Sequence, residues 1–245
     1  MSLVKQVLIS VLFSFPFSHA PGFTILSEQQ TKSKILIDDD FNRSEENELL
    51  EQIGNGWGTN SEKRAKGVKQ VDLVEGSMKI TRAKEADHGV SVIHEASFQD
   101  AALTLRFKLG ENDDLGINLA DMNEKSVHAG HLCVARIRLN QLEITDLKTG
   151  RMNSERRQRR QSGSETKEDK KQVASKTYKR SLNLEANRWC ELEVTVVGDR
   201  MVVKINGVER GSFESDGIAH PTKSRIRLSV NRNAWVDDLK LVRLK

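Results

Sequence analysis

The histidines of this sequence are its side chains best suited to acid–base chemistry, because an unperturbed imidazole titrates near neutral pH. Five lie beyond the first twenty residues, and four of these fall within one 44-residue stretch: His88, His94, His128 and His131. Asp121 adds a carboxylate to the same stretch. We therefore take His88, His128, His131 and Asp121 as catalytic candidates, expected to move a proton to or from a substrate.

Metal binding is a second chemistry that these residue types permit. His128-Ala129-Gly130-His131 has a three-residue spacing that could present two imidazoles to one metal, with Asp121 as a carboxylate ligand. A glycine-containing loop lacks the helical scaffold of an HExxH motif, so two hydrogen-bonding loop histidines are the simpler interpretation and we assign no metal. No cofactor is required. If the terminal strands pair, Asp39 and Asp238 could together hold a structural calcium ion. The alternative is that both are solvated charges at strand ends.

Carboxylates suited to glycoside hydrolysis are present but not in a recognisable pattern. A glycosidase needs two carboxyl groups about 5 to 10 Å apart. The candidates are Asp87, Glu95, Asp113, Asp114, Asp121 and Glu143. The strand motif ExDxxE is absent from the sequence, which argues against a conventional retaining glucanase.

Sugar recognition needs aromatic platforms and planar polar side chains. We predict Trp57, Asn118, Asn233 and Trp235 as substrate-binding residues. Trp57, in a glycine-rich segment, is expected to be the exposed platform, whereas Trp235 is as well suited to filling the core.

The elements that must position these residues are strands. Leu103, Leu105, Phe107 and Leu109 alternate with polar residues, and the same two-residue period recurs along most of the chain. Asn206-Gly207 between two such segments predicts a tight type I′ hairpin turn. Only residues 45–53 suit an amphipathic helix. The pattern predicts an all-β fold, a two-sheet antiparallel sandwich of the jelly-roll kind.

One segment, residues 151–180, interrupts this pattern. It holds 11 Lys or Arg against 4 Asp or Glu, in a chain whose net charge is +4, so the rest of the sequence is mildly acidic. Tyr178 is its one aromatic residue, and single-strand nucleic-acid binders need stacking platforms. We therefore expect a solvated, partly helical loop, with no specific nucleic-acid partner; contact with a polyanion is the alternative.

The N-terminus resembles an export signal. Lys5 precedes an apolar run from Val7 to Phe17, followed by Ser18-His19-Ala20, in which Ser18 and Ala20 are small residues suited to a cleavage site. At about 11 residues this run is shorter than the roughly 20 that a membrane span needs, and we expect no span beyond the leader. We predict a signal peptide at 1–20, a linker at 21–33 and one domain at 34–245, in an exported protein. Its two cysteines provide no disulfide framework.

The order of short motifs is familiar. It runs through Asp39-Asp40-Phe41-Asn42-Arg43, Gly54-Asn55-Gly56-Trp57, Val74-Glu75-Gly76-Ser77-Met78, Phe98-Gln99-Asp100, Asn206-Gly207 and Trp235-Val236-Asp237-Asp238-Leu239. In this the chain resembles the 3-keto-disaccharide hydrolase domain family, over about residues 35–245. The resemblance implies a concanavalin-like jelly roll, related to laminin-G-like and glucanase-like modules. It also implies a substrate whose ketone acidifies a neighbouring carbon, so that a base could initiate elimination.

Carbohydrate handling is therefore the expected function, with a glycan as partner. The sequence leaves open whether the protein is a glycoside hydrolase or lyase or a noncatalytic, lectin-like module. A surface interaction protein whose basic insert contacts polyanions is the third hypothesis. The first two differ in whether His88, His128, His131 and Asp121 converge in one pocket.

Overall fold

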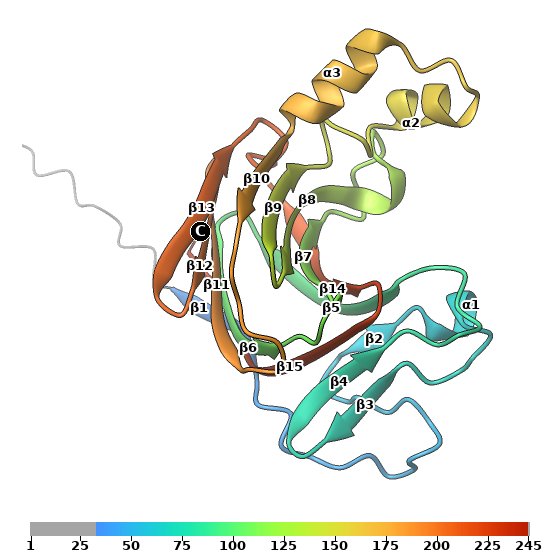
Figure 1. The fold of residues 1–245 in the computed structure, drawn as a ribbon, viewed down its shortest axis with the longest axis vertical. Helices are drawn as coiled ribbons and strands as arrows, with labels where there is room; N and C mark the ends of the chain where they lie inside the picture. The colour runs from blue at the N-terminus through green and yellow to red at the C-terminus, as the bar shows by residue number, and fades with distance from the viewer. Residues whose placement is uncertain (1–32, 245) are drawn as a thin grey trace, which may run out of the picture. The chain divides into compact units, whose positions relative to one another are not determined.

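The computed structural model describes residues 33–244, which form two antiparallel sheets (Figure 1). Sheet A contains, in spatial order, β13 (Val208–Glu214), β12 (Arg200–Ile205), β11 (Cys190–Val197), β6 (Ala101–Lys108), β15 (Asn233–Arg243), β4 (Ser77–Thr81) and β3 (Val71–Val74), with β1 (Lys34–Asp39) paired to β15. Sheet B contains β10 (Thr177–Ser181), β9 (Gln141–Asp146), β8 (His131–Arg138), β7 (Leu115–Ala120), β14 (Lys223–Val230), β5 (Val90–Phe98) and β2 (Gly58–Thr59). The predicted leader and nearly all of the predicted linker lie outside the described residues.

The core lies between the two sheets and is built from the alternating apolar residues. Leu103, Leu105 and Phe107 of β6 are at most 3% exposed, while Thr104 between them faces solvent. The facing layer comes from sheet B, where Ile117 of β7 and Leu228 of β14 are fully buried. The predicted two-sheet jelly-roll sandwich is therefore confirmed.

Hairpin turns join neighbouring strands where the sequence allows positive backbone angles. Asn206 and Gly207 have φ values of 52° and 74° and join β12 to β13. Two successive residues with positive φ fit the expected type I′ turn, which matches the twist of the flanking strands.

The helices differ from the sequence-based expectation. They are α1 (Ser61–Arg64), the short 3-10 helix η1 (His128–Gly130), α2 (Ser154–Gln161) and α3 (Lys167–Ser175). The basic segment, expected to be a partly helical loop, forms two helices, and Thr166 and Asp169 form a reciprocal capping box at the start of α3. Asp169 also accepts two hydrogen bonds from Arg159 of α2, which ties the two helices together.

The helix expected at residues 45–53 is not formed. Its glutamates instead accept hydrogen bonds from backbone N–H groups distant along the chain: Glu51 from Gln70 and Val71, and Glu45 from Leu73. The segment therefore serves as an irregular brace against β3, and its side chains satisfy backbone donors that a helix would leave unpaired.

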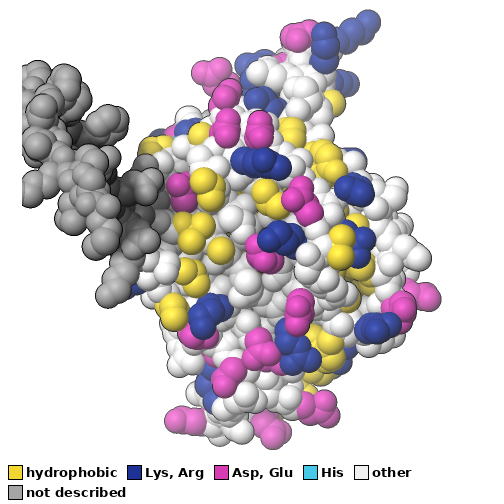
Figure 2. Space-filling view, turned by 90° about the vertical axis from the view of Figure 1, so that its left-hand side faces the viewer, with side chains coloured by type: hydrophobic (Ala, Val, Ile, Leu, Met, Phe, Trp, Pro, Cys, Tyr) yellow, Lys and Arg dark blue, Asp and Glu magenta, His cyan; other side chains and the backbone are white. Residues whose placement is uncertain are grey.

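The outer face of sheet A carries charges of both signs (Figure 2). Lys204 pairs with Glu193 at 3.0 Å and Arg200 with Glu214 at 3.8 Å, so basic side chains on this face lie beside acidic ones. Within residues 33–244 no helix is long and apolar enough to cross a bilayer.

Candidate functional site

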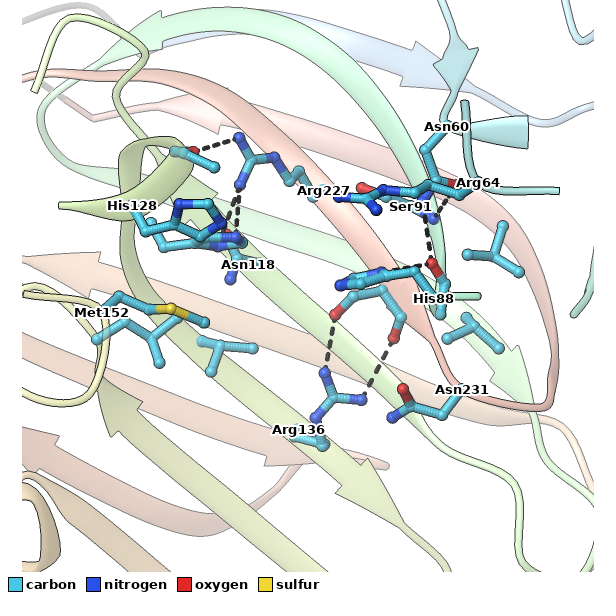
Figure 3. Close-up of a pocket in the computed structure, with 18 of the residues that line it drawn as sticks. Asn60, Arg64, His88, Ser91, Asn118, His128, Arg136, Met152, Arg227 and Asn231 are labelled. Atoms are coloured by element: carbon cyan, nitrogen blue, oxygen red, sulfur yellow. Dashed lines mark hydrogen bonds between the residues drawn. The ribbon is translucent and has the colours of Figure 1, made fainter. Parts of the chain in front are cut away.

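The outer face of sheet B carries a cavity of about 600 Å³, called here the sheet-B pocket. Its floor is formed by β5, β7, β8 and β14, and α1 and the insert helix α2 border it on opposite sides. Five arginines line it: Arg64, Arg136, Arg151, Arg160 and Arg227. Three histidines do so as well: His88, His128 and His131. Figure 3 shows His88 and Arg64 on one side of the space and His128 and Met152 on the other.

Arg136 lies across the floor of the pocket. Its guanidinium donates a hydrogen bond to the Ser229 hydroxyl at 3.0 Å and pairs with Asp114 beside the strand ends. Gly116 makes room for this arrangement, since an added Cβ would lie 2.4 Å from the Ser229 hydroxyl and 2.9 Å from Arg136. The alternation along β8 turns Arg136 outward, because Ala135 and Ile137 on either side fill the core.

His131 is held between two partners at the start of β8. The Asn118 side-chain oxygen lies 3.2 Å from its Nδ1, and an amide oxygen only accepts, so Nδ1 carries the hydrogen. Arg227 Nη1 lies 3.1 Å from Nδ1 and 3.2 Å from Nε2, and with the hydrogen on Nδ1 it donates to Nε2. Burial, followed by the nearby Arg227 and His128, lowers the pKa of His131 to about 3. His131 is therefore a neutral ring whose two nitrogens are both engaged.

His88 and His128 are the exposed histidines of the pocket. Nδ1 of His88 lies 3.0 Å from the Gly89 carbonyl oxygen, so this nitrogen carries the hydrogen. Nε2 of the neutral ring then bears a lone pair, and no partner for it occurs among the described residues. Partial burial, and then Arg157 and Arg227, lower the pKa of His128. A lowered pKa favours the neutral, basic form of the His128 ring.

Asp121 does not line the pocket, contrary to its prediction as a catalytic candidate. Its carboxylate is 4% exposed and accepts from the Thr222 hydroxyl at 2.7 Å, His220 Nε2 at 3.1 Å and the Asn123 backbone at 2.9 Å. Burial alone would raise its pKa, but these hydrogen bonds outweigh it and lower the pKa to about 2. Asp121 thus anchors the loop before His128 to the start of β14.

Trp57 is the clearest correction among the predicted sugar-binding residues. It is 8% exposed, its ring centroid lies 5.9 Å from that of Phe41, and its indole nitrogen donates to Asp39 at 2.8 Å. The glycines around it bring the chain close to β5 instead of exposing the ring, since an added Cβ at Gly56 would lie 3.1 Å from His94. Trp57 is a core residue and offers no stacking platform.

Of the other three predicted sugar-binding residues, the pocket contains only Asn118. Trp235 lies on β15 in sheet A, half-buried, with the Lys108 ammonium 4.3 Å from its ring centroid. Asn233 donates through its side chain to Asp113 at 3.1 Å and lies outside the pocket lining.

The two aspartates proposed for calcium belong to strands that do pair, with Asp39 opposite Leu239. Their carboxylates are otherwise engaged, however: Asp39 accepts from Arg43 and Trp57, and Asp238 pairs with Arg106 at 3.3 Å. Within the described part of the chain, no group of three or more His, Cys, Asp or Glu side chains is placed to hold a metal ion.

Sequence reasoning missed the arginines, which dominate the site. Arg136 and Arg227 each lie between two core-facing residues, a pattern that predicts an outward side chain but not which side chains it will meet. Arg227 contacts His131, which precedes it by 96 residues. This contact depends on the strand order β8–β7–β14 and could not be derived from local spacing.

The sequence model of the 3-keto-alpha-glucoside-1,2-lyase-like domain matches residues 50–241. No curated protein matches the chain. Among solved structures, a non-specific endo-beta-1,3(4)-glucanase from family GH16 is 12% identical with a TM-score of 0.57, covering 88% of this chain and 92% of its own. A laminarinase from Flavobacterium sp. UMI-01 is 9% identical with a TM-score of 0.54, covering 86% and 100%. An endo-beta-1,3-glucanase from Pyrococcus furiosus is 12% identical with a TM-score of 0.52, covering 86% and 94%. These structures share the fold.

Proposed function

The chain belongs to the 3-keto-alpha-glucoside-1,2-lyase-like domain family, and on this premise we propose that it binds a 3-keto-glycoside in the sheet-B pocket and cleaves it by elimination. One observation carries the proposal: His88 and the pair His128 and His131, which belong to separate segments of the chain, line the same cavity. A cavity of about 600 Å³ is within the usual range for small-molecule sites, roughly 300 to 1,000 Å³.

A histidine is the proposed base because the described lining of the pocket includes neither Asp nor Glu. The two-carboxylate mechanism of ordinary glycosidases therefore has no support in this pocket. His88 is the best placed of the three, since its Nδ1–H is fixed on the Gly89 carbonyl and its Nε2 lone pair is free. His131 is less suited, because Arg227 occupies its accepting nitrogen.

The reaction requires a ketone at C3 of the sugar and the glycosidic bond at C1. Nε2 of His88 takes the proton from C2, which the neighbouring ketone acidifies, and the electron pair forms an enolate on the C3 oxygen. The enolate then collapses, the C1–O bond breaks and a C1=C2 double bond forms. The departing oxygen takes up a proton, so the products are an unsaturated keto sugar and an alcohol.

The arginines of the pocket supply the positive charge that an enolate needs. Hydrogen-bond donors placed where negative charge develops stabilise the transition state more than the neutral substrate. Arg136, held across the floor by Ser229, and Arg227, held by His131, are fixed in place without any ligand.

The test is product analysis with the purified full chain and a panel of disaccharides and their 3-keto derivatives. The proposal expects one unsaturated keto sugar and one alcohol from each cleaved 3-keto-glycoside, and no cleavage of the parent sugar. Binding of 3-keto-glycosides without turnover would favour the noncatalytic, lectin-like alternative. Failure to bind any of them would contradict the proposal.

We further propose that the protein is exported, on the strength of the leader-like residues 1–20. N-terminal sequencing of the protein recovered from its native cells, together with its distribution between the cell interior and the exterior, tests this. An intact N-terminus on intracellular protein would contradict it.

A further inference from the structure

We infer that the sheet-B pocket selects an acidic saccharide, one that carries a carboxylate or a sulfate ester, and that Arg151, Arg160 and Arg227 bind this anionic group. The inference rests on the proposed function, because it names the sugar class taken by the same pocket. The supporting observation is that three arginines of the pocket form no ion pair with any carboxylate of the described residues.

Only two of the five pocket arginines have a carboxylate partner among the described residues. Arg136 pairs with Asp114, and Arg64 pairs with the exposed Asp87 at 3.4 Å. The other three, which form no such ion pair within residues 33–244, are Arg151, Arg160 and Arg227. The outer face of sheet A is different, because its basic side chains lie beside acidic ones (Figure 2).

Arg227 is the most deeply buried of the three, at 6% exposure. Its guanidinium donates to the Ala129 carbonyl at 2.7 Å and to His131, contacts the Met122 sulfur, and so has only neutral partners. Burial, and then the neighbouring Arg225, lower its pKa to about 10 against the weaker opposing effect of Glu95, and the group is still charged at neutral pH. A buried charge without a counter-ion is costly, and a bound anion would relieve that cost.

Arg151 and Arg160 bring the insert into the pocket. The Arg151 Nε is buried and has no hydrogen-bond partner in the described structure, while its backbone carbonyl accepts from Arg160 at 3.3 Å. Burial lowers the pKa of Arg151; the Glu143 carboxylate, which forms no ion pair with it, opposes this shift, and Arg136 and Arg160 lower the pKa further. The guanidinium groups of Arg151 and Arg160 thus lie on the insert side of the pocket, close enough to Arg136 that a bound anion would offset their mutual repulsion.

The chemistry favours an acidic sugar over a nucleic acid. Guanidinium groups bind carboxylate and sulfate oxygens through paired N–H donors. Single-stranded nucleic acids also require aromatic faces for stacking, yet the one aromatic residue of the insert, Tyr178, packs against the core. The cationic groups line a cavity on one sheet rather than an extended track.

The experiment measures binding to the full chain by calorimetry with three matched disaccharides: one containing a uronate, its carboxyl-reduced counterpart and a sulfated counterpart. We expect at least one acidic sugar to bind roughly tenfold or more tightly than the neutral one, as charge-assisted hydrogen bonds imply. This preference should be lost in the Arg151→Gln/Arg160→Gln double variant and in Arg227→Gln. Lys171→Gln, which removes the same charge from the exposed surface of α3, should retain it.

Each outcome decides one question. Equal affinity for acidic and neutral sugars would overturn the inference, even where 3-keto-glucosides are cleaved and the proposed function stands. Tight acidic binding, together with no elimination from any 3-keto-glycoside, would support the inference and overturn the proposed function. Loss of acidic binding in Lys171→Gln as well, or tighter binding of a single-stranded oligonucleotide, would show a general polyanion surface and overturn the inference. Because Arg227 is buried, the insert variants decide the matter if Arg227→Gln does not fold.

Discussion

His88 differs from the other pocket histidines in the atom that it leaves free. The Gly89 carbonyl fixes the hydrogen on Nδ1, so a neutral ring turns an unengaged lone pair on Nε2 to the pocket. At His131 the same lone pair is taken by Arg227. Acid–base catalysis depends on an available lone pair at the right protonation state, so these two rings should differ in function.

Replacing His88 should therefore abolish turnover while leaving the fold intact. We expect His88→Gln to lower kcat on a 3-keto-glucoside by about 10²- to 10⁴-fold, the usual contribution of a general base, with little change in KM. Product release followed by chromatography gives kcat, and a thermal melt controls for folding, since the side chain is exposed. An unchanged kcat would move the role of base to His128.

Trp57 and Asp39 form a buried pair whose loss should affect stability and not sugar binding. Trp57→Phe removes the donor at 2.8 Å from a carboxylate that is 4% exposed, and it shortens the ring. We expect a loss of about 2 kcal/mol in the free energy of unfolding, measured in urea, because hydrogen bonds to charged groups contribute about 1.5 to 3 kcal/mol. Normal stability with weakened sugar binding would instead identify Trp57 as a binding residue.

Among the elements, the loop from Asp121 to Gly130 positions His128. A single backbone hydrogen bond joins the two ends of this loop. The Asp121 N–H donates to the Gly130 carbonyl at 2.9 Å, and Gly130 has a φ of 69°. An added Cβ at Gly130 would lie 2.3 Å from the Asp121 carbonyl oxygen. Both the backbone angle and the close approach therefore require glycine.

A pair of glycine substitutions separates these two requirements. Gly163 in the insert also has a positive φ, 73°, but an added Cβ there meets nothing within 4 Å. Gly163→Ala should cost about 1 kcal/mol locally. Gly130→Ala should cost more, about 2 to 4 kcal/mol once the clash is added, and should lower kcat because His128 shifts. Chemical unfolding and kinetics test this; equal effects would mean that the loop relaxes freely.

How far the sequence predicts these elements depends on the range of the interactions that form them. Alternation and the Asn206-Gly207 turn are local, and both predicted the strands correctly. Residues 45–53 are not helical because Glu51 bonds to Gln70 and Val71, contacts that no local pattern contains. The pocket was least predictable: its histidines could be named from their residue type, but the arginines beside them are brought there by strand order and by the insert helices.

At the scale of the whole molecule, acid should destabilise the fold in two steps that begin near the pocket. The pKa of His131 is about 3 in the folded protein, compared with the usual 6.5. Below pH 6.5, therefore, His131 becomes protonated in the unfolded chain but stays neutral in the folded protein. Stability from this group is complete above about pH 6.5 and declines as the pH falls towards 3. Asp121, with a folded pKa of about 2 against 3.8, adds a second loss as the pH falls from about 4 through 2.

Urea unfolding at pH 7, 5.5 and 4.5 should show the first step. One proton of difference changes the free energy of unfolding by at most about 1.4 kcal/mol per pH unit. His131→Gln should reduce the pH dependence of the free energy of unfolding between pH 6.5 and 4.5. The remaining dependence should come from His128, whose pKa is also lowered. Asp121→Asn should leave this dependence unchanged and reduce the loss of stability below pH 4. A wild-type stability that stays constant from pH 7 to 4.5 would mean that His131 takes up its proton without unfolding. The burial of its ring beside the charged Arg227 would then not govern its protonation.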